Sequence, residues 1–133
     1  MQDKDRELSA YRLSLAKETL ANAGMCLDNR FYRDCINRSY YAVFYSIKAI
    51  LAIEGIDFKR HKDAVAYFNK SYVATGVFPR EVGKRLGRIK MMREESDYSD
   101  FFIVSEEDAR RQYETAQYIT AAIEEYLAGD NER

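Results

Sequence analysis

The sequence is poor in several residue types that would narrow its function. It has one histidine, His61, two cysteines and no tryptophan among 133 residues. A single histidine without a C-x-x-C pair cannot complete a typical zinc site or the Glu-x-x-His repeats of a di-iron bundle. We interpret Cys26 and Cys35 as reduced thiols that pack as small apolar residues. The sequence therefore indicates no metal site, and we expect no cofactor.

An excess of either charge and a long apolar run are also missing. The chain carries 21 Lys and Arg residues against 22 Asp and Glu residues, a net charge of −1. No global field favours nucleic acid, so any such binding must come from a local patch. No run approaches the roughly 18 apolar residues that a transmembrane helix needs, and the amino terminus, MQDKDREL, resembles no signal peptide. We expect one cytoplasmic domain over residues 1–133 that does not enter a membrane.

Helix breakers are scarce, with one proline, Pro79, and six glycines. Apolar residues recur at steps of three and four, which is typical of amphipathic helices. Gly55 and Gly129 should end two of these helices, Ser105 should cap the start of the last one, and the tail 130–133 should be frayed. The pattern predicts helices at about 5–28, 30–54, 62–73, 80–95 and 105–128, with a loop over 96–104.

The predicted helices are joined by short loops, and short loops favour antiparallel packing of the helices that they connect. The helix from 30 to 54 carries the widest apolar stripe, which indicates a central position in contact with neighbours on more than one side. We therefore expect an all-α fold, an up-and-down four-helix bundle with one additional short helix.

Side chains that suit ligand binding gather on the second predicted helix, in the segment RSYYAVFY. Helical spacing places Arg38, Tyr41 and Tyr45 along one line. A guanidinium beside phenol rings can bind a phosphate while the rings stack on a base. The alternative interpretation is structural, with Tyr40 packed in the core and Arg38 in an ion pair.

A basic cluster, KRHK at 59–62, surrounds the single histidine. Arg60 and Lys62 are suited to phosphate contacts. The cationic neighbours should lower the pKa of His61 by like-charge repulsion, which leaves a neutral imidazole that can act as a base. A lone histidine at a helix start is more often a cap or a packing residue than a base.

The fourth predicted helix holds a run of six cations, among them Arg88 and Arg93. Arg93 and Asp97 are four residues apart and can pair on the helix, and Tyr98 follows them. An arginine held in this way suits phosphate binding or an internal structural network. A basic strip beside the acidic residues of 94–100 also suits a protein partner, and a solvated helix face is the remaining interpretation.

Taken together, RSYYAVFY, KRHK and the REESDY of Arg93–Tyr98 resemble the HEPN family of small helical domains. The resemblance implies a helical bundle that forms homodimers and often stands beside an MNT-type nucleotidyltransferase in a toxin–antitoxin pair. Ribonucleases of the family share an Arg-x(4–6)-His motif. The arginine of that motif corresponds to Arg93 here, but positions 98–101 hold no histidine.

We therefore predict a HEPN-type module that binds a nucleotide, RNA or a nucleotidyltransferase partner. The alternative is a metal-independent endoribonuclease toxin with a displaced site, in which Arg93 holds the phosphate and Tyr98 or His61 moves protons. Tyrosine is the weaker candidate, because its ordinary pKa of about 10 makes it a poor base at neutral pH. A third possibility is a structural dimerisation domain without a ligand. The candidate binding residues are Arg38, Tyr41, Tyr45, Arg60, His61, Lys62, Arg88, Arg93 and Asp97.

Overall fold

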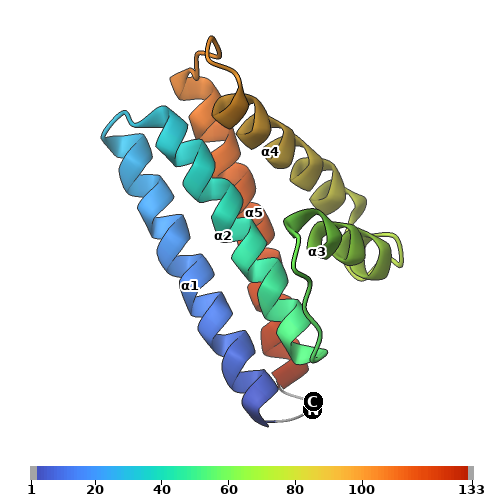
Figure 1. Cartoon of the computed structure of the whole chain (residues 1–133). Coiled ribbons are helices and arrows are strands. Elements are labelled where there is room, and N and C mark those ends of the chain that lie inside the picture. Colours follow the sequence, from blue (N-terminus) through green and yellow to red (C-terminus); the bar gives the residue numbers. More distant parts are fainter. Residues whose placement is uncertain (1–2, 132–133) are drawn as a thin grey trace.

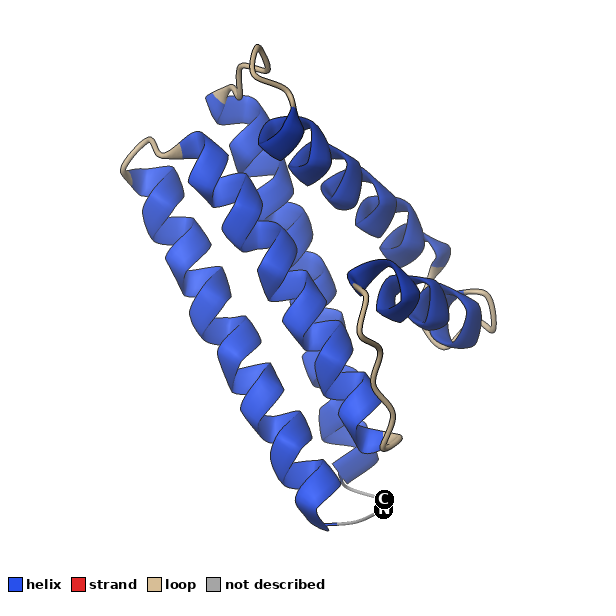
Figure 2. Cartoon of the chain, viewed as in Figure 1, coloured by secondary structure: helices blue, strands red, loops and turns tan. Residues whose placement is uncertain are grey.

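The computed structural model describes residues 3–131. This part of the chain is built of helices and connecting loops and contains no strand, which confirms the predicted all-α class (Figure 2). In chain order the elements are α1 (Asp3–Asp28), α2 (Tyr32–Ile53), α3 (His61–Phe68), the π-helix η1 (Asn69–Val73), α4 (Arg80–Tyr98) and α5 (Glu106–Asn131).

The long helices α1, α2 and α5 lie side by side, and α4 is inclined against them (Figure 1). The chain alternates in direction through α1, α2, α4 and α5, as the up-and-down prediction requires. α2 packs against all the other α-helices, α1, α3, α4 and α5. The additional short helix, α3, lies beside α2 near the start of α4.

The central place of α2 follows from its sequence. Its stripe residues Ile36, Val43, Ile47 and Ile50 are fully buried, and they recur at the spacing that places apolar side chains on adjoining faces of one helix. Burial of so many branched side chains supplies the main driving force for the bundle. The wide stripe therefore predicts the helix that every other α-helix contacts.

Several helix ends follow local chemistry. Gly55 lies just beyond α2 with φ +70°, a conformation that glycine adopts without strain. At the start of α5, the Asp108 N–H donates to Ser105 Oγ at 3.0 Å and the Ser105 N–H donates to Asp108 Oδ2 at 3.5 Å. This reciprocal pair is the predicted amino-terminal cap, with aspartate in place of the usual glutamate.

Three predicted boundaries were wrong. α4 continues to Tyr98 instead of ending near 95, and within this last turn Ser96 packs inward and is only 1% exposed. α5 continues through Gly129 to Asn131, where Leu127, 3% exposed, anchors the final turns. The segment 62–73 forms α3 and then a π-helical turn instead of one regular helix. Of the tail predicted to fray, 130–131 are helical, and 132–133 lie outside the described residues.

The cysteines are free thiols, with Cys35 buried and Cys26 half-buried. Within residues 3–131, no group of three or more His, Cys, Asp or Glu side chains is placed to hold a metal ion. None of the helices in that range combines the length and the apolar character that crossing a membrane requires.

Candidate functional site

The aromatic ring of Tyr41 is the centre of a polar cluster between α2, α3 and α4. The Tyr45 ring lies one turn along α2, 6.0 Å away, and the His61 ring meets Tyr41 edge-on at 5.8 Å and 83°. Tyr41 and Tyr45 are both half-buried, so each keeps part of its ring open to solvent. The line of side chains predicted from helical spacing thus exists on α2, and α3 adds an imidazole to it.

Two arginines from different helices face this ring. The Cζ atom of Arg38 lies 5.3 Å from the Tyr41 ring centroid, and that of Arg93 lies 5.5 Å from it. Arg93 also lies 5.0 Å from the centroid of Tyr40 and donates from Nη2 to the Tyr41 hydroxyl at 3.2 Å. Cations within about 6 Å of a ring centroid are attracted to the ring face. Tyr40 and Tyr41 therefore position the guanidinium of Arg93.

Arg93 forms the predicted i,i+4 ion pair with Asp97, with Nε and Oδ2 2.9 Å apart. The Nε–H does not point at the carboxylate, so this buried N–H has no hydrogen-bond acceptor. The side chain of Arg93 is 17% exposed and that of Asp97 is 26% exposed. A guanidinium with an unmatched donor gains from an additional acceptor, because an unpaired buried donor costs free energy.

Arg38 has a different kind of partner. Its Nε and Nη2 both donate to the Asn37 side-chain oxygen, at 3.3 and 2.8 Å. This neutral amide orients the guanidinium without neutralising it, in contrast to the ion pair expected under the structural interpretation. Arg38 and Arg93 thus both face Tyr41, and of the two only Arg93 is paired with a carboxylate.

His61 begins α3 and packs flat against Phe44 of α2, with ring centroids 3.9 Å apart and planes at 29°. Burial lowers the pKa of His61 below its ordinary value of 6.5, and the charges of Arg93 and Lys48 lower it further. The predicted direction was right, but the predicted cause was not. The responsible cations come from α2 and α4 and are not the chain neighbours of His61. At neutral pH the imidazole is uncharged.

Three predicted candidates lie apart from this cluster. Arg60 is exposed and pairs with Asp63 at 3.0 Å, and Lys62 is exposed to solvent. Arg88 lines a separate cavity between α4 and α5. Tyr98, 76% exposed at the end of α4, lies at the edge of the cluster, near enough to Tyr40 to add to the effect of burial in raising the pKa of that phenol. The structure therefore brings together Arg38, Tyr41, Tyr45, His61, Arg93 and Asp97 and separates Arg60, Lys62 and Arg88 from them.

Three residues of α2 that complete the cluster were not among the binding residues predicted from the sequence. Tyr40, 2% exposed, supports Arg93, and Phe44 is the ring beneath His61. Lys48 adds a cation 5.9 Å from the Phe44 ring and forms an ion pair with Asp57. Their spacing of four residues places all three on one face of α2, which is the signal that could have identified them.

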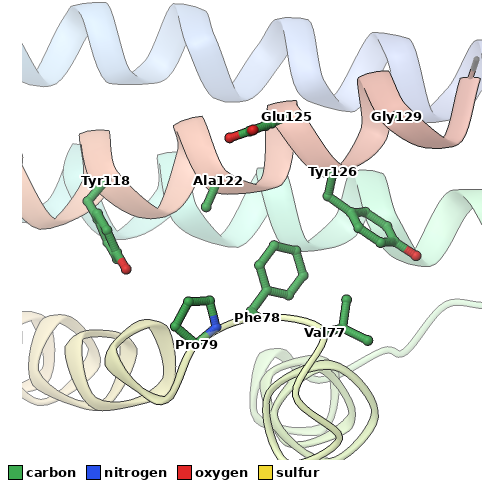
Figure 3. Close-up of a pocket in the computed structure, with 8 residues that line it drawn as sticks. All are labelled: Val77, Phe78, Pro79, Tyr118, Ala122, Glu125, Tyr126 and Gly129. Atoms are coloured by element: carbon green, nitrogen blue, oxygen red, sulfur yellow. The ribbon is translucent and has the colours of Figure 1, made fainter.

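A pocket of about 400 Å³ lies elsewhere, between α5 and the loop before α4. In Figure 3, Ala122 and the rings of Tyr118 and Tyr126 point from α5 toward Phe78 and Pro79. Phe78 is 4% exposed and belongs to the main core. No residue of the Tyr41 cluster lines this pocket. Its lining is mostly apolar, so it offers little to the phosphate chemistry that the cluster supports.

Comparisons with known proteins agree with the fold and with the sequence pattern. A UPF0332 protein of Thermotoga maritima is 32% identical over 127 residues, 96% of either chain. A Methanocaldococcus jannaschii protein named "putative toxin" is 28% identical over 114 residues, 86% of this chain and 85% of its own. A second protein of that organism and name is 24% identical over 126 residues, 95% of this chain and 85% of its own. The HEPN domain model matches residues 9–126, and the chain belongs to the HEPN domain family.

Proposed function

We propose that the cluster around Tyr41 binds a phosphate group of a nucleotide or an RNA strand, and that the protein is the toxin-like member of a two-protein system. One observation carries the phosphate proposal: guanidinium groups of α2 and α4 converge on one tyrosine ring. Arginine suits this role because its fork of donors matches phosphate oxygens.

The surroundings of the two arginines support an anionic ligand. Arg38 has no carboxylate in the contacts that orient it, and Arg93 has an N–H without an acceptor. Tyr41 and Tyr45 are partly open, so a base attached to the phosphate can stack on their rings. The ligand is therefore held by its charge at the arginines and by its base at the tyrosines.

The partner in this proposal is an MNT-type nucleotidyltransferase, and the protein itself forms a homodimer. The names of the two Methanocaldococcus relatives support the toxin-like role, and the family membership supports the pairing. Size-exclusion chromatography with light scattering tests both points. We expect a dimeric mass for the protein alone and a larger complex when an MNT-type nucleotidyltransferase is added.

Binding of a fluorescein-labelled RNA oligonucleotide, followed by anisotropy at fixed salt, tests the phosphate site. We expect Arg93→Gln and Arg38→Gln each to weaken binding by at least about tenfold, which corresponds to about 1.4 kcal/mol. Lys84→Gln is the matched control, because it removes one charge from an exposed position of α4 outside the cluster. Equal losses in all three variants would indicate general charge attraction and contradict the site.

The second candidate function is metal-independent RNA cleavage, and one observation favours it. His61 and Arg93 contact the ring of Tyr41 from the same chain, so a neutral base and a phosphate-binding cation are neighbours. The imidazole would take the proton of a 2′-hydroxyl, whose oxygen attacks the adjacent phosphorus while Arg93 holds the phosphate. The bond to the 5′-oxygen breaks, and that oxygen takes up a proton from solvent water, while the imidazolium later releases its proton to solvent. The products are a 2′,3′-cyclic phosphate and a 5′-hydroxyl.

Incubation of mixed RNA with the protein in EDTA separates the two functions. Cleavage that disappears in both His61→Gln and Arg93→Gln would support the ribonuclease. If wild type and both variants leave the RNA intact while wild type still binds it, the binding module stands. Cleavage that persists in both variants would exclude this site as its source.

A further inference from the structure

A second concentration of positive charge lies between α4 and α5. A cavity of about 250 Å³ is enclosed there by residues of both helices. α4 contributes Arg85 and Arg88, and α5 contributes Arg111. The cavity is completed by Gln112, Glu114 and Thr115. The lining holds three guanidinium groups and one carboxylate, and two of the guanidinium groups also pair with glutamates beside the cavity, Glu81 and Glu107.

Two of the three arginines form ion pairs. Arg85 Nε lies 2.9 Å from Glu81 Oε1, and its Cζ atom lies 4.5 Å from the ring centroid of Tyr118. Arg111 Nη2 lies 2.6 Å from Glu107 Oε1. The contacts of Arg85 orient its guanidinium, whereas the side chains of Arg111 and Glu107 are 63% and 77% exposed and their pair is screened by solvent.

Arg88 differs from these two arginines, because it forms no ion pair with any residue in the described range 3–131. Its charge therefore remains available to an anion.

Gln112 gives a second and independent indication of a ligand. The residue is only 4% exposed, and its Oε1 atom is buried without a hydrogen-bond partner. Buried polar atoms are nearly always paired, and an unpaired one destabilises the fold. The NH₂ end of the same amide is not fully buried, so it can donate to an anion in the cavity without turning over. Thr115, 7% exposed, adds a hydroxyl to the same wall.

We propose that this cavity binds a small diphosphate-type anion. The charge suits phosphate oxygens, and the lining contains no aromatic ring on which a base could stack. The guanidinium of Arg85 already lies over the ring of Tyr118, so that ring does not offer its face to a base. The ligand is therefore recognised through its phosphates and not through a base.

The cavity is separate from the Tyr41 cluster. Arg88 and Arg93 are five residues apart on α4, which places them about 140° apart around the helix axis. Arg93 faces Tyr40 and Tyr41 on α2, whereas Arg88 faces the side of α5 that carries Arg111. The diphosphate site thus goes beyond the proposed function and does not depend on it.

Isothermal titration calorimetry with pyrophosphate at constant ionic strength tests the proposal. We expect Arg88→Gln and Arg111→Gln each to weaken pyrophosphate binding at least about tenfold, whereas Lys84→Gln and Arg93→Gln leave it within about twofold. Because nucleotides can also bind at the Tyr41 cluster, AMP and ATP are compared in Arg93→Gln, where ATP should bind about as tightly as pyrophosphate and AMP much more weakly. No pyrophosphate binding, equal binding of AMP, or equal losses in all four variants would overturn the proposal.

Thermal unfolding of Gln112→Met gives a separate readout. Methionine keeps the volume but removes the unpaired amide, so the Tm without ligand should rise. The increase in Tm that pyrophosphate causes in wild type should shrink, because the amide no longer contributes to binding. A lower Tm with an unchanged response to pyrophosphate would show that the amide serves the fold, and would contradict its role in the site.

Discussion

The imidazole of His61 stacks on the ring of Phe44, with the two centroids 3.9 Å apart. Burial in this stack, together with the charges of Arg93 and Lys48, lowers the pKa of His61 below its ordinary value of 6.5. The unfolded chain therefore binds the proton at a higher pH than the folded chain. The contribution of His61 to stability is complete above the unfolded pKa of 6.5 and decreases as the pH falls through it.

Urea unfolding from about pH 5 to pH 8 measures this effect. We expect the free energy of unfolding of wild type to fall toward acid more steeply than that of His61→Phe, which keeps an aromatic ring against Phe44 but cannot be protonated. The difference between the two curves isolates His61 from the carboxylates, which titrate in both proteins. Parallel curves would show that the imidazole is not perturbed by its surroundings.

Asp97→Asn should change stability and binding in opposite directions. The i,i+4 ion pair with Arg93 is partly screened by solvent, so its loss should lower the free energy of unfolding by only about 0.3–1 kcal/mol. Removing this carboxylate also removes a competitor for Arg93, so RNA should bind more tightly. Glu95→Gln removes an exposed charge of α4 and is the control for general electrostatics. Weaker RNA binding in Asp97→Asn would mean that Asp97 orients Arg93 and does not compete for it.

The centre of α2 should tolerate truncation poorly. Ile47 is fully buried in the main core, so Ile47→Ala should lower the free energy of unfolding by about 2–5 kcal/mol. Met91 is 54% exposed on α4, and Met91→Ala should cost less than about 0.5 kcal/mol. Chemical denaturation with both variants measures the difference. Similar losses would contradict the central position of α2.

The start of α5 depends on its cap. Ser105→Ala removes the oxygen that accepts the Asp108 N–H, and should lower the free energy of unfolding by about 1 kcal/mol. Ser99→Ala, in the exposed loop before α5, is the matched control and should have little effect. Thermal and urea unfolding of the two variants test the assignment. Equal effects would show that the Ser105 hydroxyl does not stabilise the helix.

Relationships within one or two turns of helix were predictable from the sequence. The approach of Arg38 and Tyr45 to Tyr41, the Arg93–Asp97 pair and the Ser105 cap each depend on residues three or four apart. The helices themselves also follow from their apolar periodicity. Their ends were less predictable, because packing at Ser96 and Leu127 extends α4 and α5 beyond the local signals.

The meeting of His61 with the α2 and α4 side chains was not predictable in the same way. It depends on how the loop after Gly55 returns α3 to α2, which no local pattern specifies. Arg88 was predicted to be a phosphate-binding residue together with Arg93, but it lines the cavity against α5. Tertiary packing decides which charges of a basic helix share a site.

The titration of His61 by NMR tests the phosphate site most directly. His61 is the only histidine of the sequence, so its ring resonances need no assignment. In the free protein its pKa should lie below 6.5. At saturating RNA oligonucleotide the pKa should rise, since a phosphate beside Arg93 stabilises the charged imidazolium. In Arg93→Gln the free pKa should be higher than in wild type, and RNA should change it little. An identical pKa with and without bound RNA in wild type would contradict a phosphate site at Tyr41, His61 and Arg93.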